Sequence, residues 1–330
     1  MKINQRLFDH YGIDTSKDLG IQKTCSRPYD TVLIDKMGSC YACECTAWLP
    51  QSIGNLQIKT LDEILNTDMR EHLQGSVSDG TYRYCNEHQC PYIKDMIPTP
   101  KESNDIKHIR LAIDDSCNLR CPSCRNGLIF HKEGSAYRLG IKLADRINEW
   151  LANVRHPVQV HMGSDGDPFA SQVYRYFMEH VPDRDSITFS IMTNGLMFCE
   201  YHTRIPRVLA RLHQLEVSID GVTQDTYEHL RLGGRWQALL KNLRRMGEKK
   251  QEHGFQWNWH MVVQEQNWRE MPAMLKMAQA HGVDKMYFNR IRDWGTSLDV
   301  SSQRFHELEE FQTMRHDLAR HRIAITAGLL

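Results

Sequence analysis

Short apolar runs alternate with amphipathic stretches along most of the chain after residue 105. Six of these runs have the length and composition of strands. The predicted strands are residues 108–113, 158–163, 187–193, 214–219, 257–263 and 285–290. Strands that alternate with helical segments predict an α/β fold with a parallel sheet. Six such units favour a partial (β/α)6 TIM-like barrel, whose functional loops follow the C-terminal ends of the strands.

Helical periodicity is clearest in two of the intervening segments. Residues 137–154 carry leucine and isoleucine along one stripe, and residues 271–282 end on Gly282, a residue type common just after a helix. A last helix is predicted over residues 301–321, where an amphipathic pattern follows a serine cap. We interpret it as a lid or packing helix.

A linker separates the predicted barrel from the N-terminal part of the chain. Residues 96–105, MIPTPKESND, combine two prolines with polar side chains, so the domain boundary is placed near residue 103. The expected organisation is an N-terminal extension (1–24), a small cysteine-rich domain (25–102), a barrel (103–300) and a C-terminal helix (301–330).

Composition and charge exclude several classes of protein. The 330 residues include 41 Lys and Arg and 41 Asp and Glu, so no basic surface for nucleic acid is indicated. The chain shows no apolar signal segment and no run of about 18 apolar residues, which predicts neither export nor a membrane span. We expect a cytoplasmic protein. Ten cysteines in a reducing compartment favour metal or cluster ligation over disulfides.

The cysteines fall into two groups, with Cys199 alone. Cys117, Cys121 and Cys124 form a CxxxCxxC run directly after the first predicted barrel strand. Three thiolates on one loop can bind three irons of a cubane cluster and leave the fourth iron open to another ligand. A zinc loop is the alternative, although zinc would require a fourth ligand.

This spacing resembles the signature of the radical S-adenosylmethionine (SAM) superfamily. The resemblance implies a 4Fe-4S cluster whose open iron chelates the amino and carboxylate groups of SAM. It further implies that an electron from the cluster cleaves the C5′–S bond, giving a 5′-deoxyadenosyl radical that abstracts hydrogen. Members of the family often have an aromatic residue before the last cysteine, and Ser123 stands there in this chain. Another residue must then pack on the adenine.

The later strand ends extend the resemblance over about residues 106–292. The run HMGSDGDPF resembles the glycine-rich motif whose backbone and carboxylate meet the methionyl ammonium. The third and fourth strands end in TNG and in LEVSIDG, which are similar to family sequences that contact ribose or the methionyl carboxylate. The implied SAM contacts are Gly166, Asp167, Pro168, Thr193, Asn194, Ser218, Asp220, Arg231 and the Val262 backbone. Each of these taken alone could equally be a turn, cap or surface residue.

Strand alternation separates two kinds of residue on the fifth predicted strand. His260 is expected on the opposite face from Trp257 and Trp259, so these residues divide between core and substrate wall. Asn289, on the sixth strand, is expected to face the pocket. Cys199 is interpreted as a small buried residue, with hydrogen donation to a substrate radical as the alternative.

The N-terminal cysteines resemble the SPASM and twitch auxiliary-cluster domains of this superfamily, which usually follow the barrel. Cys25-x12-Gly38-x4-Cys43 fits the opening of the SPASM pattern. The resemblance implies one auxiliary 4Fe-4S cluster, held by Cys25, Cys43, Cys85 and Cys90, with Cys40 and Cys45 as substitutes or bystanders. The fold expectation is thus a partial barrel with a small N-terminal iron-sulfur cluster domain. A structural zinc site is the alternative, because four thiolates also satisfy tetrahedral zinc.

The function implied by the resemblance is a radical SAM enzyme. Relatives with such auxiliary domains modify peptides or proteins by cross-linking, epimerisation or rearrangement, or they dehydrogenate or epimerise sugars and aminocyclitols. We favour a peptide or protein substrate and keep the small-molecule substrate as the alternative. The expected reductant is a flavodoxin or ferredoxin. Two other hypotheses remain: methyl transfer, and a two-cluster electron-transfer protein without catalysis. We expect the 24 residues before Cys25 to be too few for a winged-helix leader-recognition domain, so a peptide would need a separate partner or another docking surface.

Overall fold

The computed structural model describes residues 3–22, 24–94, 103–293, 295–318 and 324–326. Most of the predicted linker, residues 96–105, therefore lies outside the described residues. The chain divides into two compact units. Unit 1 comprises Met1–Asp114, Glu133–Asp165 and His180–Thr188, and unit 2 comprises Asp115–Lys132, Gly166–Glu179 and Phe189–Leu330.

Unit 1 contains a five-stranded sheet and most of the N-terminal helices. Its strands are β1 (Thr31–Asp35), β2 (Ser39–Tyr41), β3 (Ser52–Asn55), β4 (His108–Ala112) and β5 (Val158–Met162). Its helices are α1 (Gln5–His10), α2 (Arg27–Asp30), α3 (Leu61–Leu65), α4 (Asp68–Ser78), α5 (Pro91–Lys94) and α6 (Gly134–Asn153).

The sheet of unit 1 joins the N-terminal region to the first two barrel strands. Strands β1, β2 and β3 pair antiparallel, whereas β1 pairs parallel with β4, which pairs parallel with β5. Val32 lies opposite Ile109 in the β1–β4 pair, and both are fully buried. Apolar residues on both faces are typical of a strand inside a sheet covered on two sides. The cysteine-rich region therefore shares a sheet with β4.

Helix α6 packs against the N-terminal part of unit 1. Leu143 and Ile147 are fully buried on its apolar stripe, as the periodicity predicts. A Cβ at Gly38 would lie 3.0 Å from Leu143 Cδ2, and Gly38 has a φ of +76°. Trp150 Nε1 donates to Asp62 Oδ1 at 2.7 Å on the same side. Glycine is thus required at position 38 both for the turn and for the close approach of α6.

Unit 2 contains a parallel sheet flanked by helices. The strands pair in the order β6 (Ile187–Thr193), β7 (Leu212–Ser218), β8 (Gln256–Val263), β9 (Lys285–Arg290) and β10 (Ala324–Thr326), and the first two residues of β6 belong to unit 1. The helices are α7 (Gln172–Glu179), α8 (Phe198–Tyr201), α9 (Pro206–Ala210), α10 (Gln224–Leu230), α11 (Trp236–His253), α12 (Met271–Ala280) and α13 (Glu309–Leu318). Short 3-10 turns are η1 (His202–Arg204), η2 (Trp268–Glu270) and η3 (Phe305–Glu307).

The six predicted strands are confirmed as β4 to β9, with ends that differ by at most two residues. The α/β class and the unclosed parallel strands of a partial barrel are confirmed as well. The predicted C-terminal helix was too long: it begins at Glu309, after η3, rather than at Ser301. Its Phe311 ring lies 5.1 Å from the Phe305 ring, so this helix packs against the segment that precedes it.

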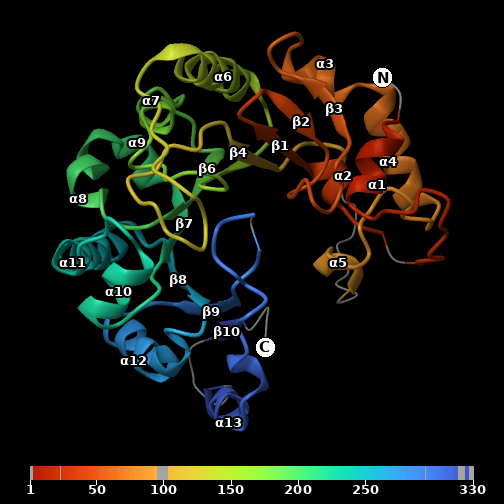
Figure 1. The fold of residues 1–330 in the computed structure, drawn as a ribbon. Helices are drawn as coiled ribbons and strands as arrows, with labels where there is room; N and C mark the ends of the chain where they lie inside the picture. The colour runs from red at the N-terminus through yellow and green to blue at the C-terminus, as the bar shows by residue number, and fades with distance from the viewer. Residues whose placement is uncertain (1–2, 23, 95–102, 294, 319–323, 327–330) are drawn as a thin grey trace. The chain divides into compact units, whose positions relative to one another are not determined.

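Helices α11 and α12 lie along one side of β7, β8 and β9 (Figure 1). A Cβ at Gly247 of α11 would lie 3.6 Å from the Trp257 ring, and the Trp259 ring lies 5.3 Å from that of His281, after α12. Both tryptophans are fully buried, whereas the His260 side chain keeps 15% exposure. The predicted alternation on β8 is therefore confirmed. No helix in the described part of the chain has the length and apolarity needed to cross a membrane.

Candidate functional site

The loop that carries Cys117, Cys121 and Cys124 is fixed by backbone hydrogen bonds within unit 2. The Cys117 N–H donates to Ile129 O at 2.9 Å, and the Arg120 N–H donates to Leu232 O at 3.0 Å. A turn closes the segment, since the Cys124 N–H donates to Cys121 O at 2.9 Å. The three thiols are thus presented by a backbone held at both ends.

Two of the three thiols are buried, and Cys124 is exposed. Cys117 Sγ accepts from the Leu119 N–H at 3.4 Å and from Asn194 Nδ2 at 3.7 Å. Burial, with the nearby Asp167 charge, raises the pKa of Cys117 to about 11, and burial also raises the pKa of Cys121. Such thiolates need a compensating positive charge, which iron bound by them would supply. The donor set of three cysteines on one loop fits a cubane cluster with one open iron.

Arg125 is a site residue that the sequence analysis missed. Its Nη1 donates to Asp115 O at 2.9 Å, and its Nη2 donates to Cys124 Sγ at 3.8 Å. Burial lowers the pKa of Arg125, but the bond to Cys124 and the charges of the cysteines outweigh burial and raise it. The available signal was its position directly after the third cysteine.

Asp167 ties the glycine-rich turn to the end of β6. Its side chain is 1% exposed. The carboxylate accepts from the N–H groups of Phe169 (3.0 Å), Ala170 (3.0 Å) and Asn194 (2.7 Å), and from Thr193 Oγ1 (2.8 Å). A carboxylate has about four acceptor positions, so protein donors fill this one. Burial raises the pKa of Asp167, and these hydrogen bonds offset only part of the rise. The contacts give no support to a role as partner of the methionyl ammonium.

Asn194 connects the end of β6 to the cysteine loop. Its Nδ2 donates to Asn118 Oδ1 at 2.8 Å as well as to Cys117 Sγ, and its Oδ1 accepts from the Leu196 N–H at 3.0 Å. The Asp167 N–H donates to Ser116 O at 2.8 Å, which adds a second link to the loop. Gly166 and Pro168 lie in the same turn, where Gly166 has a φ of +70°. Thr193, Asn194 and the 166–168 turn are thus brought together around Cys117.

A buried ion pair lies beyond the end of β7. Asp220 Oδ2 lies 2.6 Å from Arg231 Nε, with side-chain exposures of 1% and 12%. Burial lowers the pKa of Arg231, but the charges of Asp220 and Cys121 outweigh burial and raise it. Arg231 therefore lies near the cysteine loop.

The backbone of Val262 is already engaged within the protein. Its N–H donates to Asp220 Oδ1 at 2.8 Å, and its C=O accepts from Asn267 Nδ2 at 2.9 Å. Ser218 ends β7 opposite His260. Asp220 therefore joins β7, β8 and Arg231, and Asn267, which the sequence analysis did not select, reinforces this junction.

Cys199 lies apart from these residues, on α8. Its N–H donates to Asn242 Oδ1 at 2.7 Å, on α11. Burial raises the pKa of this half-buried thiol, and Lys241 and Arg245 of α11 lower it. These contacts place Cys199 in the helix layer.

In unit 1, Cys25, Cys43, Cys85 and Cys90 influence one another. Burial raises the pKa of Cys43 well above its ordinary value, and the charges of the other three raise it further. Burial also raises the pKa of Cys90 to about 11. Cys40 is separate: its Sγ lies 3.7 Å from Gly38 O, and burial and Asp35 raise its pKa to about 12.

Tyr82 is a second residue missed from the sequence. It is buried, and burial followed by the charges of Cys25 and Cys85 raises its pKa. Its φ of +48° makes it the one non-glycine residue with positive φ in the described part of the chain. Such backbone conformations are held by their surroundings and are common at functional sites.

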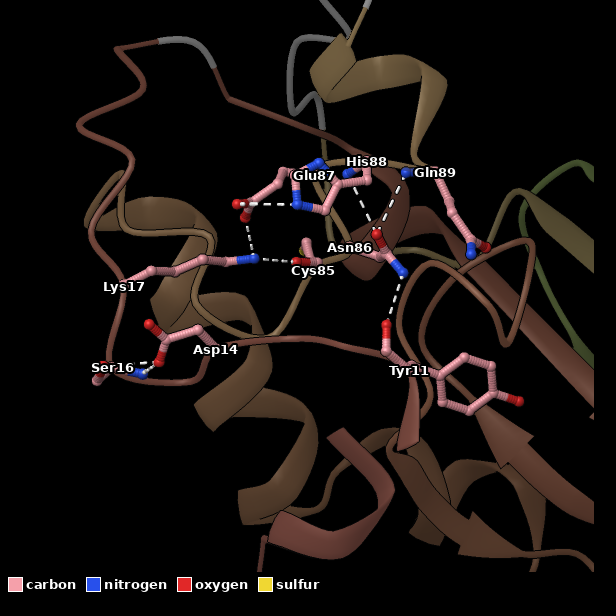
Figure 2. A network of polar contacts seen from close by, with 9 residues as sticks. All are labelled: Tyr11, Asp14, Ser16, Lys17, Cys85, Asn86, Glu87, His88 and Gln89. Carbon is pink, nitrogen blue, oxygen red and sulfur yellow. Dashed lines mark hydrogen bonds and ion pairs between the residues drawn. The ribbon is translucent and has the colours of Figure 1, made fainter. Parts of the chain in front are cut away.

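Residues of the N-terminal segment hold the loop that carries Cys85 and Cys90 (Figure 2). Lys17 Nζ donates to Cys85 O at 2.5 Å and forms an ion pair with Glu87. Asn86 Oδ1 accepts from the His88 N–H at 3.1 Å, and its Nδ2 donates to Tyr11 O at 3.2 Å. The segment before Cys25 therefore supports the loop that carries Cys85 and Cys90 directly.

Fold and site together define the class of protein: an α/β protein with a three-cysteine loop at the ends of parallel strands. The model of the radical SAM superfamily matches residues 113–278, about half of the chain. The chain belongs to this superfamily, whose members hold a 4Fe-4S cluster and SAM.

Curated relatives share only part of their length with the chain. A protein named probable GTP 3',8-cyclase, from Methanococcus maripaludis, is 26% identical over 141 residues, which is 42% of this chain and 45% of that protein. A PqqA peptide cyclase from Granulibacter bethesdensis is 27% identical over 188 residues, which is 55% of this chain and 46% of that protein. The matched region thus spans less than half the length of either relative.

Solved structures of similar fold include Streptococcus suis SuiB bound to the precursor peptide SuiA. This match has a TM-score of 0.44 and 13% identity, and it covers 66% of this chain and 48% of SuiB. The enzyme anSMEcpe, bound to AdoMet and a peptide, matches with a TM-score of 0.44, 17% identity and coverage of 66% and 62%.

Proposed function

We propose that the chain cleaves SAM reductively to a 5′-deoxyadenosyl radical, which abstracts hydrogen from a peptide or protein. A 4Fe-4S cluster bound by Cys117, Cys121 and Cys124 would supply the electron for this cleavage. A flavodoxin or ferredoxin would deliver that electron. The 55% of the chain that is similar to a peptide cyclase favours a peptide substrate, whereas the likeness to GTP cyclases makes a nucleotide the competing choice.

The observation that carries the proposal is that residues from several predicted strand ends lie together around one cysteine loop. Asn194 Nδ2 donates to Cys117 Sγ, and the positive charge of Arg231 lowers the pKa of Cys121. Arg125 donates to Cys124. These groups can stabilise thiolates and exclude water from two of the three sulfurs. An electron carrier would require no such convergence of motifs from several strand ends.

The test is anaerobic incubation of the reconstituted full chain with SAM and dithionite. We expect 5′-deoxyadenosine to form, and Cys117→Ala to abolish its formation and the iron bound at this loop. Cys199→Ala is the matched control and should keep the full iron content. Formation of S-adenosylhomocysteine would indicate methyl transfer instead. If a fully loaded, reducible protein forms neither product with peptides, GTP or sugars, the electron-carrier alternative is favoured.

We further propose one auxiliary 4Fe-4S cluster, held by Cys25, Cys43, Cys85 and Cys90. Their mutual effects on pKa support a shared site. Tetrahedral zinc with sulfur at about 2.3 Å needs sulfurs roughly 3.8 Å apart. A structural zinc site is the competing choice, because four thiolates also satisfy tetrahedral zinc.

Metal analysis tests this second cluster. The reconstituted chain should bind about eight iron atoms, and Cys85→Ala about four. Cys40→Ala is the control for loss of a buried thiol and should keep about eight iron atoms. Zinc in the purified protein that survives reconstitution and is lost in Cys85→Ala would overturn the cluster in favour of the zinc site.

A further inference from the structure

One face of β7, β8 and β9 carries polar side chains, of which only Ser218 is among the expected SAM contacts. It is the face opposite the buried tryptophans of β8. In the strand register, Glu216 lies opposite Asn258, which lies opposite Lys285. Two residues further along, Ser218, His260 and Tyr287 form the next row. Side chains of these two rows point to the same face because strands alternate with a period of two.

Three neighbours hold the imidazole of His260. Its ring stacks on Tyr287 with a centroid distance of 4.4 Å and an interplanar angle of 9°. Asn289 Nδ2 lies 3.2 Å from His260 Nδ1, and Glu216 Oε1 lies 3.3 Å from His260 Nε2. Although this carboxylate is near, His260 Nε2 has no hydrogen-bond partner among the described residues. His260 is therefore oriented rather than free to rotate.

Asn258 lies beside this group and is fully buried. Neither its Oδ1 nor its Nδ2 has a hydrogen-bond partner among the described residues. A buried amide without a partner destabilises the folded state, because the donor and acceptor lose their bonds to water. Trp257 and Trp259, its chain neighbours, point to the helix side, so the amide points to the polar face. Asn258 thus places a donor and an acceptor, both without a partner among the described residues, on the polar face.

The polar face lies close to the radical site along the same strands. Val262, two residues beyond His260, donates to Asp220, which pairs with Arg231. At about 3.3 Å per residue, His260 lies roughly 7 Å along the strand before this junction. A molecule bound over His260 and Asn258 would therefore lie within reach of chemistry at the strand ends.

We infer that Asn258, His260 and Glu216 form a substrate subsite for a neutral hydrogen-bonding group, an amide or a hydroxyl. This inference rests on the proposed function and deepens it by naming the chemistry of the substrate. A peptide amide complements Asn258, since its C=O can accept from the Asn258 NH2 group and its N–H can donate to Oδ1. Glu216 and Lys285 flank Asn258 with opposite charges, so a polyanion such as a triphosphate finds no net positive field there. The subsite therefore favours an amide or a hydroxyl over a phosphate group.

The first test measures thermal unfolding without any ligand. Asn258→Leu replaces an unpartnered amide by an apolar side chain of similar size, so its melting temperature should equal or exceed that of the parent. Asn242→Leu is the matched control: Asn242 is also buried, but it donates to Leu196 O and Ala238 O and accepts from the Cys199 N–H. Asn242→Leu removes these three hydrogen bonds and should lower the melting temperature by several degrees. An equal fall for Asn258→Leu would overturn the subsite.

The second test measures binding by NMR of histidine ring signals, with the His260 signal assigned through His260→Gln. Acetamide probes amides, glycerol probes hydroxyls, and inorganic phosphate probes anions. A shift of the His260 signal by acetamide or glycerol, lost in Asn258→Leu, supports the subsite and identifies the group. A shift by phosphate alone, or by none of the probes, overturns it. Neither test needs SAM cleavage, so failure here with 5′-deoxyadenosine still formed would leave the proposed function intact.

Discussion

The Asp220 carboxylate shows how single residues organise the site. It is almost fully buried, and it accepts from Val262 while it pairs with Arg231. A charge in this position is tolerated only because its partner is present. Asp167 shows the same logic with four donors in place of one cation.

Asp220→Asn should destabilise the fold strongly, because it leaves the Arg231 guanidinium buried without its counter-charge. The expected loss of unfolding free energy is about 3–5 kcal/mol, measured by urea titration. The exposed pair Arg245–Glu248 is the control, and Glu248→Gln should cost at most about 1 kcal/mol. Equal small effects for both variants would contradict the importance assigned to the buried pair.

Lys17 and Glu87 should shift the potential of the proposed auxiliary cluster in opposite directions. Lys17 lowers the pKa of Cys85 and bonds to its carbonyl, so its cation stabilises added negative charge at this site. Lys17→Met should therefore make the midpoint potential more negative, and Glu87→Gln should make it less negative. Potentiometric titration followed by electron paramagnetic resonance measures both. Shifts in the same direction would indicate structural damage rather than an effect of charge.

At the scale of elements, the contact of α6 with the turn before β2 explains the glycine of the SPASM-like pattern. Gly38 combines a φ of +76° with the approach of Leu143. A side chain there would suffer both the backbone strain and the collision.

Gly38→Ala should destabilise the protein more than Gly20→Ala. Gly20 has a φ of +57°, and a Cβ added to it would have no other atom within 4 Å, so its substitution reports the backbone strain alone. The extra cost at Gly38 should be about 1–3 kcal/mol from overpacking, measured by chemical unfolding. Equal costs would show that α6 yields to the added methyl group without strain.

At the scale of the whole molecule, the buried cysteines couple stability to cluster loading. The pKa values of Cys117 and Cys90 are raised to about 11, above the ordinary thiol value of about 8.5. A raised folded-state pKa stabilises the protein below the unfolded value, and that stabilisation is lost as pH rises through the folded value.

The cluster-free protein should thus lose stability between about pH 8.5 and pH 11. The reconstituted protein should show a smaller loss, because its ligand thiols are already deprotonated and bound. Melting temperatures of both forms across this range make the comparison, and they share the pH effects of every other group. Parallel curves for the two forms would contradict the coupling.

Local pattern determined the six strands, both cysteine groups and the alternation that divides His260 from Trp257 and Trp259. These features depend on periodicity and on spacing within short segments, and both are visible in a sequence. The site residues at the end of β6 and after β7 were likewise selected from motifs. The structure links them to the cysteine loop, because Asn194 donates to Cys117 and the charge of Arg231 acts on Cys121.

Contacts between distant segments decided the rest. The pairing of β1 with β4, the support of Cys85 by Lys17 and the four donors that fill Asp167 all join residues far apart in the chain. The same holds for Cys40, which packing rather than spacing separates from the other N-terminal cysteines. Periodicity states which face of a strand is buried but not what covers it. Only the folded chain shows which donors, charges and unmet amides meet there.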